Sequence, residues 1–286
     1  MSHETEPTRL DDNQVTTHSE ITDRTPIRRR WWLELSYVVG FYIVYSFIRN
    51  QFGSGGNFSV GPQRALDNAE LIIDLERVLG LYIELAIQDA FIGWDWFIWA
   101  WNVFYGSAHF VVTGGVMVFL YIRAPNRYRR YRNILSATTA LALFGFSLFP
   151  LMPPRLLNAG GDYGANLNDH DYVDTLSEFG GLWSFDSGTM QSISNQWAAM
   201  PSLHIAWALW CTVALYPIAT TRWARAAVAV YPALTMFAIV VTGNHFWIDA
   251  VGGAIVLWFG WHIGNQASMR IAARPLETVS ATPRRQ

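Results

Sequence analysis

Apolar residues gather into long runs separated by short polar segments, and they are not spread evenly along the chain. A helix of about 20 apolar residues is long enough to cross the hydrocarbon core of a bilayer. The runs predict six such spans, at 31–48, 96–122, 134–151, 202–220, 226–241 and 246–264. We therefore predict an all-α fold: a polytopic membrane protein with six transmembrane helices.

The segment between the first two spans has the polar and apolar periodicity of amphipathic helices. Its polar stripe consists of Asp67, Glu70, Asp74 and Arg77. The apolar positions that fall elsewhere around the helix are Leu66, Ala69, Ile72, Ile73 and Leu79. After Gly80 a second short helix is expected to carry Glu84 and Gln88 on one face. Both helices are predicted to lie on the outer face of the membrane, either as architecture, which we favour, or as a lid over a substrate.

The composition agrees with a membrane protein. Half of the 286 residues are apolar (51%) and only 15% are charged, against about 25% in a typical soluble domain. The 14 Trp and 12 Tyr residues suit the membrane–water boundary. The net charge of −2 gives no sign of a nucleic-acid partner, and Cys211, the single cysteine, excludes an intrachain disulfide.

The arginines predict the orientation, since cytoplasmic segments of membrane proteins carry the excess of basic residues. With both termini in the cytoplasm, sixteen of the twenty basic residues fall inside, and every one of them is Arg. The four outside are Arg49, Arg64, Arg77 and Arg155. We expect a disordered cytoplasmic tail at 1–30, a membrane domain at 31–265 and a second cytoplasmic tail at 266–286. The first apolar run is expected to be a retained anchor, because no cleavage pattern follows it.

The second long outer segment, residues 152–200, is rich in Gly, Asp, Asn and Ser and is too polar to span a membrane. Its acidic residues include Asp162, Asp169, Asp171 and Asp174. They are expected to form a solvated acidic loop, in preference to a cation site.

Four ionisable residues stand at the outer ends of predicted spans. Arg155 follows the third span, His204 begins the fourth, and His245 with Asp249 begins the sixth. The topology therefore places all four at one depth, on three helices. Ionisable residues at such positions are costly and mark functional sites by default.

These residue types suit phosphoryl transfer. His245 and Asp249 are four residues apart, so the carboxylate can accept the Nδ1–H of the imidazole and leave Nε2 as a nucleophile. His204 can act first as general acid and then as base. Arg155 presents a planar fork of donors for phosphate oxygens. Ser202 begins a helix, where free N–H groups favour an anion.

Other interpretations of these residues stay open. An intramembrane histidine can be a hydrogen-bonded packing residue, and a zinc site is the main chemical rival. No His-Glu-x-x-His motif occurs, and Asp249 is better placed to orient His245 than to share a metal with it, so no metal and no cofactor are expected. His109, in the middle of the second span, either lines a substrate path or is a satisfied core histidine.

Three stretches carry a resemblance to a known family: 149–155 (Phe-Pro-Leu-Met-Pro-Pro-Arg), 198–204 (Ala-Ala-Met-Pro-Ser-Leu-His) and 242–253 (Thr-Gly-Asn-His-Phe-Trp-Ile-Asp-Ala-Val-Gly-Gly). The chain resembles the type 2 phosphatidic acid phosphatase superfamily from about residue 31 to 265, and within it the inositol phosphorylceramide synthase branch. The resemblance implies that His245 becomes a phosphohistidine with Asp249 as its partner. His204 would protonate the leaving group. It also implies a lipid phosphate or phospholipid substrate and no metal requirement.

The chain also departs from that family. The phosphatases of the superfamily usually add a motif with Lys and Arg and a second Arg before the nucleophile, whereas this chain has no Lys, and Ile239 and Val240 occupy the region of that Arg. Arg155 is left as the one evident phosphate clamp, which suits a singly charged phosphodiester better than a monoester. The Ser-Leu-His form of the middle motif also favours transfer of a head group between lipids.

The first alternative is a lipid phosphatase acting on phosphatidate, phosphatidylglycerophosphate or a polyprenyl phosphate or diphosphate. The second is a non-enzymatic transporter or channel. A vanadium-dependent haloperoxidase uses a related site, but those proteins are soluble.

Overall fold

The computed structural model describes residues 31–52, 62–157, 171–182 and 196–272. Contacts divide the chain into two units, Met1–Val39 and Gly40–Gln286. The described part of the first unit is the beginning of α1 (Trp31–Phe52), whose large apolar side chains, Trp31 and Leu35 among them, are exposed. The predicted tail at 1–30 lies outside the described residues, as do 273–286.

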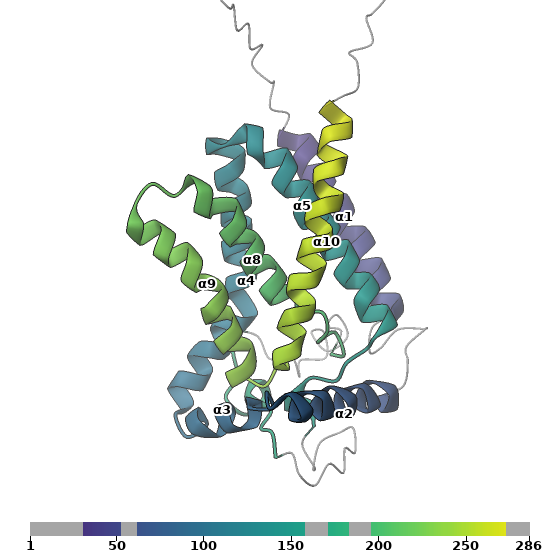
Figure 1. The fold of residues 1–286 in the computed structure, drawn as a ribbon, viewed down its shortest axis with the longest axis vertical. Coiled ribbons are helices and arrows are strands. Elements are labelled where there is room, and N and C mark those ends of the chain that lie inside the picture. The colour runs from purple at the N-terminus through teal and green to yellow at the C-terminus, as the bar shows by residue number, and fades with distance from the viewer. Residues whose placement is uncertain (1–30, 53–61, 158–170, 183–195, 273–286) are drawn as a thin grey trace, which may run out of the picture. The chain divides into compact units, whose positions relative to one another are not determined.

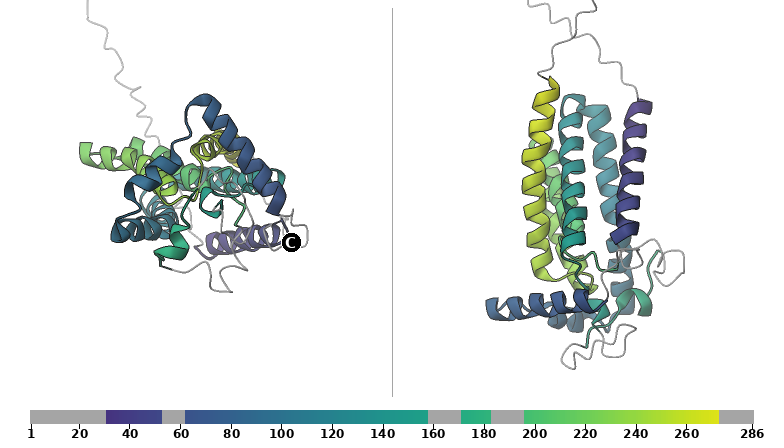
Figure 2. Two further views of the ribbon diagram at one scale, coloured as in Figure 1. Left: turned by 90° about the horizontal axis from the view of Figure 1, so that it is seen from below. Right: turned by 90° about the vertical axis from the view of Figure 1, so that its right-hand side faces the viewer.

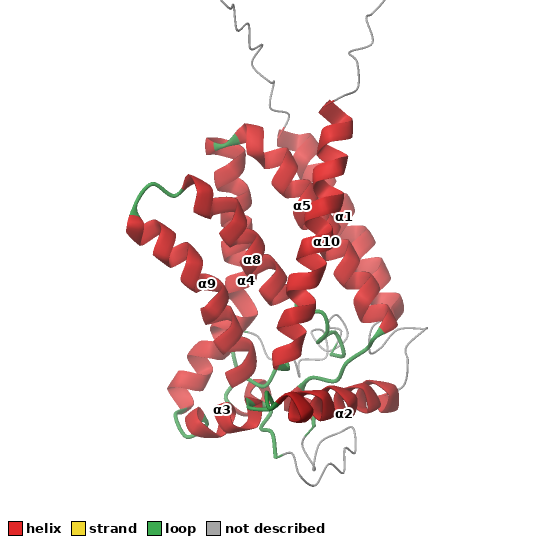
Figure 3. Ribbon diagram, viewed as in Figure 1, coloured by secondary structure: helices red, strands yellow, loops and turns green. Residues whose placement is uncertain are grey.

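The described residues of the second unit form helices and connecting turns without a strand (Figure 3). After α1 come α2 (Pro62–Leu79), α3 (Glu84–Phe91), α4 (Asp95–Arg123), α5 (Pro125–Leu148), η1 (Pro154–Leu156), α6 (Thr175–Glu178), α8 (Leu203–Leu215), η2 (Tyr216–Ile218), α9 (Arg222–Val241) and α10 (Trp247–Ala272). One isolated bridge joins Leu151 to Ala198. The all-α prediction is confirmed.

Helices α4, α5, α8, α9 and α10 run side by side, and α2 lies across one end of them (Figures 1 and 2). The α4–α5 and α8–α9 connections lie at the opposite end (Figure 1). Arginines gather around those connections, at positions 123, 127, 129, 130, 132, 222 and 225. The fold therefore separates an arginine-rich end from the end that α2 covers.

The predicted spans coincide with α1, α4, α5, α8, α9 and α10, but their lengths differ. Among the described helices, two, α4 and α9, are long and apolar enough by themselves to cross a membrane. Helix α8 has only 13 residues before η2 begins at Tyr216, and α10 continues past the predicted boundary at 265 to Ala272. Six membrane crossings therefore stay a prediction.

The two amphipathic helices are confirmed, with one exception. The predicted polar stripe of α2 is exposed, and four of its five predicted apolar positions are buried. Leu79, the fifth, is exposed because it ends the helix at the turn around Gly80. In α3, Glu84 and Gln88 do share a face, but both side chains are fully buried, so this face points into the protein.

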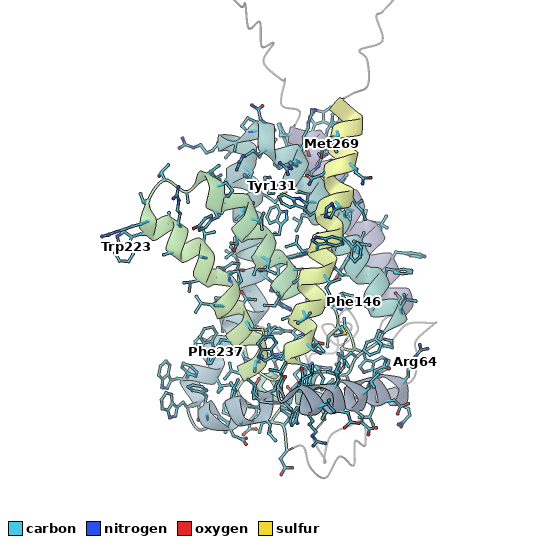
Figure 4. The ribbon with its side chains drawn as sticks, in the orientation of Figure 1. Arg64, Tyr131, Phe146, Trp223, Phe237 and Met269 are labelled. Atoms are coloured by element: carbon cyan, nitrogen blue, oxygen red, sulfur yellow. The ribbon has the colours of Figure 1, made fainter. Side chains whose placement is uncertain are left out.

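Aromatic side chains hold the bundle together at both ends. Phe237 of α9 packs against the rings of Phe91 in α3 and Trp101 in α4 (Figure 4). At the arginine-rich end, Trp210 of α8 is fully buried and donates its indole N–H to the carbonyl of Tyr131 in α5, at 3.0 Å. Buried indole and phenol groups that find such partners fix helices relative to one another.

Candidate active site

His245 and Asp249 lie at the beginning of α10 and form the predicted pair. Nδ1 of His245 lies 3.1 Å from Oδ2 of Asp249, and both side chains are almost fully buried. The reason for their contact differs from the prediction, because His245 precedes the helix, which begins at Trp247. The same Asp249 oxygen accepts the backbone N–H of Phe246 at 3.0 Å. Asp249 thus caps its own helix and fixes the two residues that lead into it, His245 and Phe246.

His204, from α8, lies next to the other nitrogen of this imidazole. Its Nδ1 is 3.3 Å from Nε2 of His245. With Asp249 ionised and His245 neutral, Nδ1 of His245 carries the hydrogen and Nε2 presents a lone pair. The Nδ1–H of His204 is then the donor to that lone pair. The ring of Tyr105 stacks on His204 with 4.4 Å between centroids and fixes its plane.

Ser202 lies where α8 begins, as predicted, but its backbone is already engaged. Its N–H donates to the carbonyl of Asp249 at 3.0 Å, and its Oγ lies 3.5 Å from Nε2 of His245. A Cβ at Gly253 would overlap the Ser202 carbonyl, so glycine permits the close approach of α10 to α8. The Ser202 N–H is therefore not among the free N–H groups expected at this helix start. Its hydroxyl and the N–H groups of the following turn, which lack intrahelical acceptors, are the groups left for an anion.

Arg155 lies in η1, after α5, and contacts the loop before α10 that leads to His245. Its N–H donates to the carbonyl of Gly243 at 2.7 Å, and its Nε donates to Oδ1 of Asn244 at 3.1 Å. Gly243 has φ +66°, a backbone conformation that glycine adopts at little cost. This turn places Asn244 under the guanidinium and His245 one residue further on.

Asp174 binds Arg155 through Nη1 at 2.6 Å, and its side chain is 25% exposed. The prediction of a solvated acidic loop is therefore wrong for this residue, while Asp162 and Asp169 lie outside the described residues. Asp174 also accepts the N–H groups that begin α6. It is held in place because two fully buried amides, Gln88 and Asn102, bind the backbone on either side of it, at residues 173, 175 and 180.

His109 lies beside His204, with 4.3 Å between ring centroids. Its Nδ1 is 2.9 Å from the carbonyl of Tyr105, one helical turn earlier. The structure thus brings His109 to the site while giving one of its nitrogens a partner within α4. Its role as part of a substrate path stays a prediction.

Several residues of this site were not predicted. Asn244 belongs to the third motif, directly before His245, and its amide at a clamp could have been expected from that position. Tyr105 and Asp174 carry no comparable signal, because nothing in the sequence shows which aromatic ring or which loop carboxylate packs against a site. Among the described residues, no three His, Cys, Asp or Glu side chains are arranged to hold a metal ion.

The geometry brings two imidazoles, a carboxylate and a guanidinium together at one end of the bundle. Nε2 of His245 has a hydrogen-bonded neighbour in His204 and a carboxylate behind it, which is the arrangement of an activated nucleophile. Arg155 binds Asn244, the residue before His245, and the hydroxyl of Ser202 lies beside Nε2 of His245. Phosphoryl transfer, in which positioning and charge stabilisation supply most of the catalysis, suits such a set.

Comparisons with known proteins support this chemistry. The family model described as "PAP2 superfamily" matches residues 70–263, more than half of the chain, and this range includes Arg155, Ser202, His204, His245 and Asp249. Neither the comparison with curated proteins nor that with solved structures found a match. The helical fold and the match together show that this chain belongs to the PAP2 superfamily, whose chemistry is that of phosphatases and phosphotransferases.

Proposed function

We propose that this protein is a membrane lipid phosphotransferase that moves a phosphate-bearing head group through a phosphohistidine at His245. The observation that carries the proposal is the hydrogen-bonded series from Asp249 through His245 to His204. It gives one imidazole a fixed tautomer, a lone pair at Nε2 and a proton carrier beside that lone pair. No simpler packing role requires this order of groups.

In the first half-reaction, Nε2 of His245 attacks phosphorus and the bond from phosphorus to the departing alcohol breaks. His204, in its protonated form, gives a proton to that alcohol oxygen. The charge that develops on the phosphoryl oxygens is held by the guanidinium of Arg155, by the hydroxyl of Ser202 and by the first-turn N–H groups of α8.

In the second half-reaction, a second alcohol attacks the phosphohistidine. His204 now takes the proton of that alcohol, and the N–P bond breaks to return His245 to its starting form. With water in place of the second alcohol, the same steps release free phosphate or a phosphorylated head group. The site therefore serves transfer and hydrolysis alike, and the acceptor decides between them.

The clamp favours a substrate with one negative charge on phosphorus. A phosphate monoester approaches two negative charges at neutral pH, whereas a phosphodiester carries one. Asp174 balances part of the Arg155 charge at 2.6 Å, so the site offers less than a full cation to a dianion. This supports head-group transfer from a phospholipid, as in inositol phosphorylceramide synthases, with a lipid alcohol as the acceptor.

A lipid phosphatase is the second candidate, because members of the PAP2 superfamily are generally phosphatases. It would use the same residues, with phosphatidate, phosphatidylglycerophosphate or a polyprenyl phosphate as substrate. The two candidates differ in products and not in the first chemical step.

We further propose that six helices cross the membrane, with the site at the outer face and the arginine-rich end in the cytoplasm. The separation of the two ends in the fold supports this orientation. Single cysteines are placed at position 70 or at position 129, in a background with Cys211 replaced by Ala. In intact cells, an impermeant maleimide is expected to label the cysteine at 70 and not the one at 129. Labelling at 129 but not at 70 would reverse the orientation.

The function is tested with purified protein in lipid nanodiscs and with a His245→Ala variant as the control. Phosphatidylinositol is offered with ceramide, or with diacylglycerol whose acyl chains differ from those of the donor, and lipid monophosphates are offered separately. A new phospholipid that requires His245 and appears without free phosphate is the expected result. Free phosphate from monophosphates alone would make the protein a phosphatase, and equal activity in the His245→Ala variant would refute the mechanism.

A further inference from the structure

The first turn of α10 is capped by three carboxyl groups, and two of them come from other helices. Phe246 donates its N–H to Asp249, Trp247 donates to Oε1 of Glu84 at 2.8 Å, and Ile248 donates to Oε1 of Glu76 at 2.9 Å. The first N–H groups of a helix have no partner within it. Here each of these three has its own carboxyl oxygen.

Glu76 lies in α2 and Glu84 begins α3, so the two helices at the end of the bundle hold the N-terminus of α10. Both side chains have no exposed surface. The second oxygen of Glu84 accepts the backbone N–H of Ile83 at 2.9 Å. One short side chain next to the helix would satisfy these N–H groups more cheaply, because burying a carboxylate carries a large desolvation cost. The arrangement is therefore more than a cap requires.

We infer that Glu76 and Glu84 form a buried carboxyl pair that positions the first turn of α10, and with it Asp249 and His245, for phosphoryl transfer. This inference rests on the proposed function. The path is short, because Glu84 and Glu76 hold Trp247 and Ile248, and these residues lie between His245 and Asp249 in the chain. A shift of this turn changes the angle at which Nε2 of His245 meets phosphorus.

One proton between Glu76 and Glu84 lets the two buried carboxyl groups lie next to each other without repulsion. Burial, followed by the hydrogen bond and the charge of Glu84 and the more distant charge of Asp249, raises the pKa of Glu76 to about 9. No group of the described residues donates to Oε2 of Glu76. A proton on that oxygen makes it a donor to Glu84, while Oε1 continues to accept from Ile248.

Among the described residues, the groups that act on Glu76 are Glu84, Ile248 and Asp249, and none of them is a cation. The titratable groups around Glu76 and Glu84 are Asp249 of α10, Tyr82 and Tyr172 of the adjoining loops, and Arg77 of α2, which acts on Tyr82. Burial raises the pKa of both tyrosines, so both are neutral near pH 9. Above the pKa of Glu76, three carboxylates would then repel one another at one helix end.

The two glutamates have opposite hydrogen-bond requirements, and this gives a sharp test. In Glu76→Gln, the amide oxygen accepts from Ile248 and the amide N–H₂ replaces the proton that faces Glu84. In Glu84→Gln, the amide N–H₂ must face the N–H of either Ile83 or Trp247, and one hydrogen bond is lost. The exposed Glu70 of α2 supplies the control variant Glu70→Gln.

The experiment measures kcat and KM for lipid transfer in nanodiscs, from neutral pH to above the pKa of about 9. Glu76→Gln is expected to keep kcat within about twofold at neutral pH and to lose the fall in kcat that the wild-type protein shows near pH 9. Glu84→Gln is expected to lower kcat about 10-fold to 100-fold, as for displaced catalytic groups, with KM unchanged. Glu70→Gln should match the wild-type protein throughout.

Equal effects of the two Gln variants, or an alkaline fall that persists in Glu76→Gln, would overturn the inference. Hydrogen–deuterium exchange of the peptide around Trp247 and Ile248 gives a readout that needs no activity. It should be faster in Glu84→Gln and unchanged in Glu76→Gln. If the wild-type protein neither transfers nor releases phosphate, the proposed function fails, and the exchange rates alone then decide on the carboxyl pair.

Discussion

The two ends of the helix bundle in the second unit bury different kinds of residue. At the end covered by α2, the interior is polar: the buried residues there include Glu76, Glu84, Gln88, Asn102, Arg155, Ser202, Asn244, His245 and Asp249. At the arginine-rich end the buried cluster is apolar and aromatic: Val116, Leu120, Tyr128, Tyr131, Ile134, Trp210, Cys211, Ala214 and Leu257. There the charged side chains are exposed or half-buried.

Because of this difference, we expect the apolar end of the bundle to contribute mainly to stability and the polar end mainly to function. Buried polar groups stabilise a fold poorly even when they are paired, because their desolvation offsets most of the gain. Of the polar side chains buried at the site end, those of Asp249, Ser202 and Asn244 contact His245 or Arg155. The side chains of Glu76, Glu84, Gln88 and Asn102 hydrogen-bond the backbone of adjoining segments. The apolar end supplies close packing, which costs no desolvation of charge. Substitutions at the end covered by α2 should therefore lower the activity, and substitutions at the arginine-rich end should lower the stability.

The largest effect is expected at His245. His245→Ala removes the atom that we propose bonds to phosphorus. It should lower kcat about 10⁴-fold or more, as removal of a catalytic nucleophile does in other enzymes, with little change in thermal stability. His262, which is exposed in α10, gives the matched control His262→Ala, which should keep full activity. Transfer assays and thermal unfolding are measured on the same samples. Substantial activity in His245→Ala would refute the separation and the mechanism together.

The next effect is expected at the opposite end, in stability. Trp210→Ala removes a fully buried ring and its 3.0 Å hydrogen bond to Tyr131, and should lower the free energy of unfolding by about 3 kcal/mol. The activity per folded molecule should not change. The control is Trp223→Ala, at the same end but with a side chain 73% exposed. A loss of kcat in folded Trp210→Ala protein would show that the apolar end also shapes the site.

A smaller effect is expected at Asp174, whose carboxylate offsets part of the positive charge of Arg155. Asp174→Asn keeps the oxygen that caps α6 but removes the charge beside Arg155. The full charge of the guanidinium then favours a dianion, and the ratio of monoester to diester turnover should rise about tenfold. Asp171→Asn, exposed in the same segment, is the control. An unchanged ratio would mean that Arg155 does not select substrates by charge.

Predictions from the sequence are most accurate for features that depend on a single helix. The six apolar runs, the stripe of α2 and the shared face of Glu84 and Gln88 all follow from the periodicity of one helix, and each is present. The candidate residues could also be found, because Arg155, His204, His245 and Asp249 stand at helix ends that the alternation of spans brings to one side.

Contacts between distant segments could not be predicted in this way. The periodicity of α3 places Glu84 on a face, but it does not reveal that this face meets the N-terminus of α10, which lies 163 residues further along the chain. The pairing of Asp174 with Arg155 has the same origin, since it depends on two buried amides that fix a loop. The helix ends at Leu215 and Ala272 also differ from the ends of the predicted spans, because hydropathy alone does not specify where a helix stops.

The smallest effect is expected at His109, the one predicted site residue with two open interpretations. If its ring lines the path of the lipid, His109→Phe removes a polar contact to the substrate and should raise KM about fivefold, the value of one hydrogen bond, with kcat nearly unchanged. His109→Asn can retain the bond to the carbonyl of Tyr105 and separates packing from substrate contact. Wild-type KM in both variants would make His109 a satisfied core residue. A tenfold fall of kcat in both would instead place it, through its contact with His204, in the transfer of the proton.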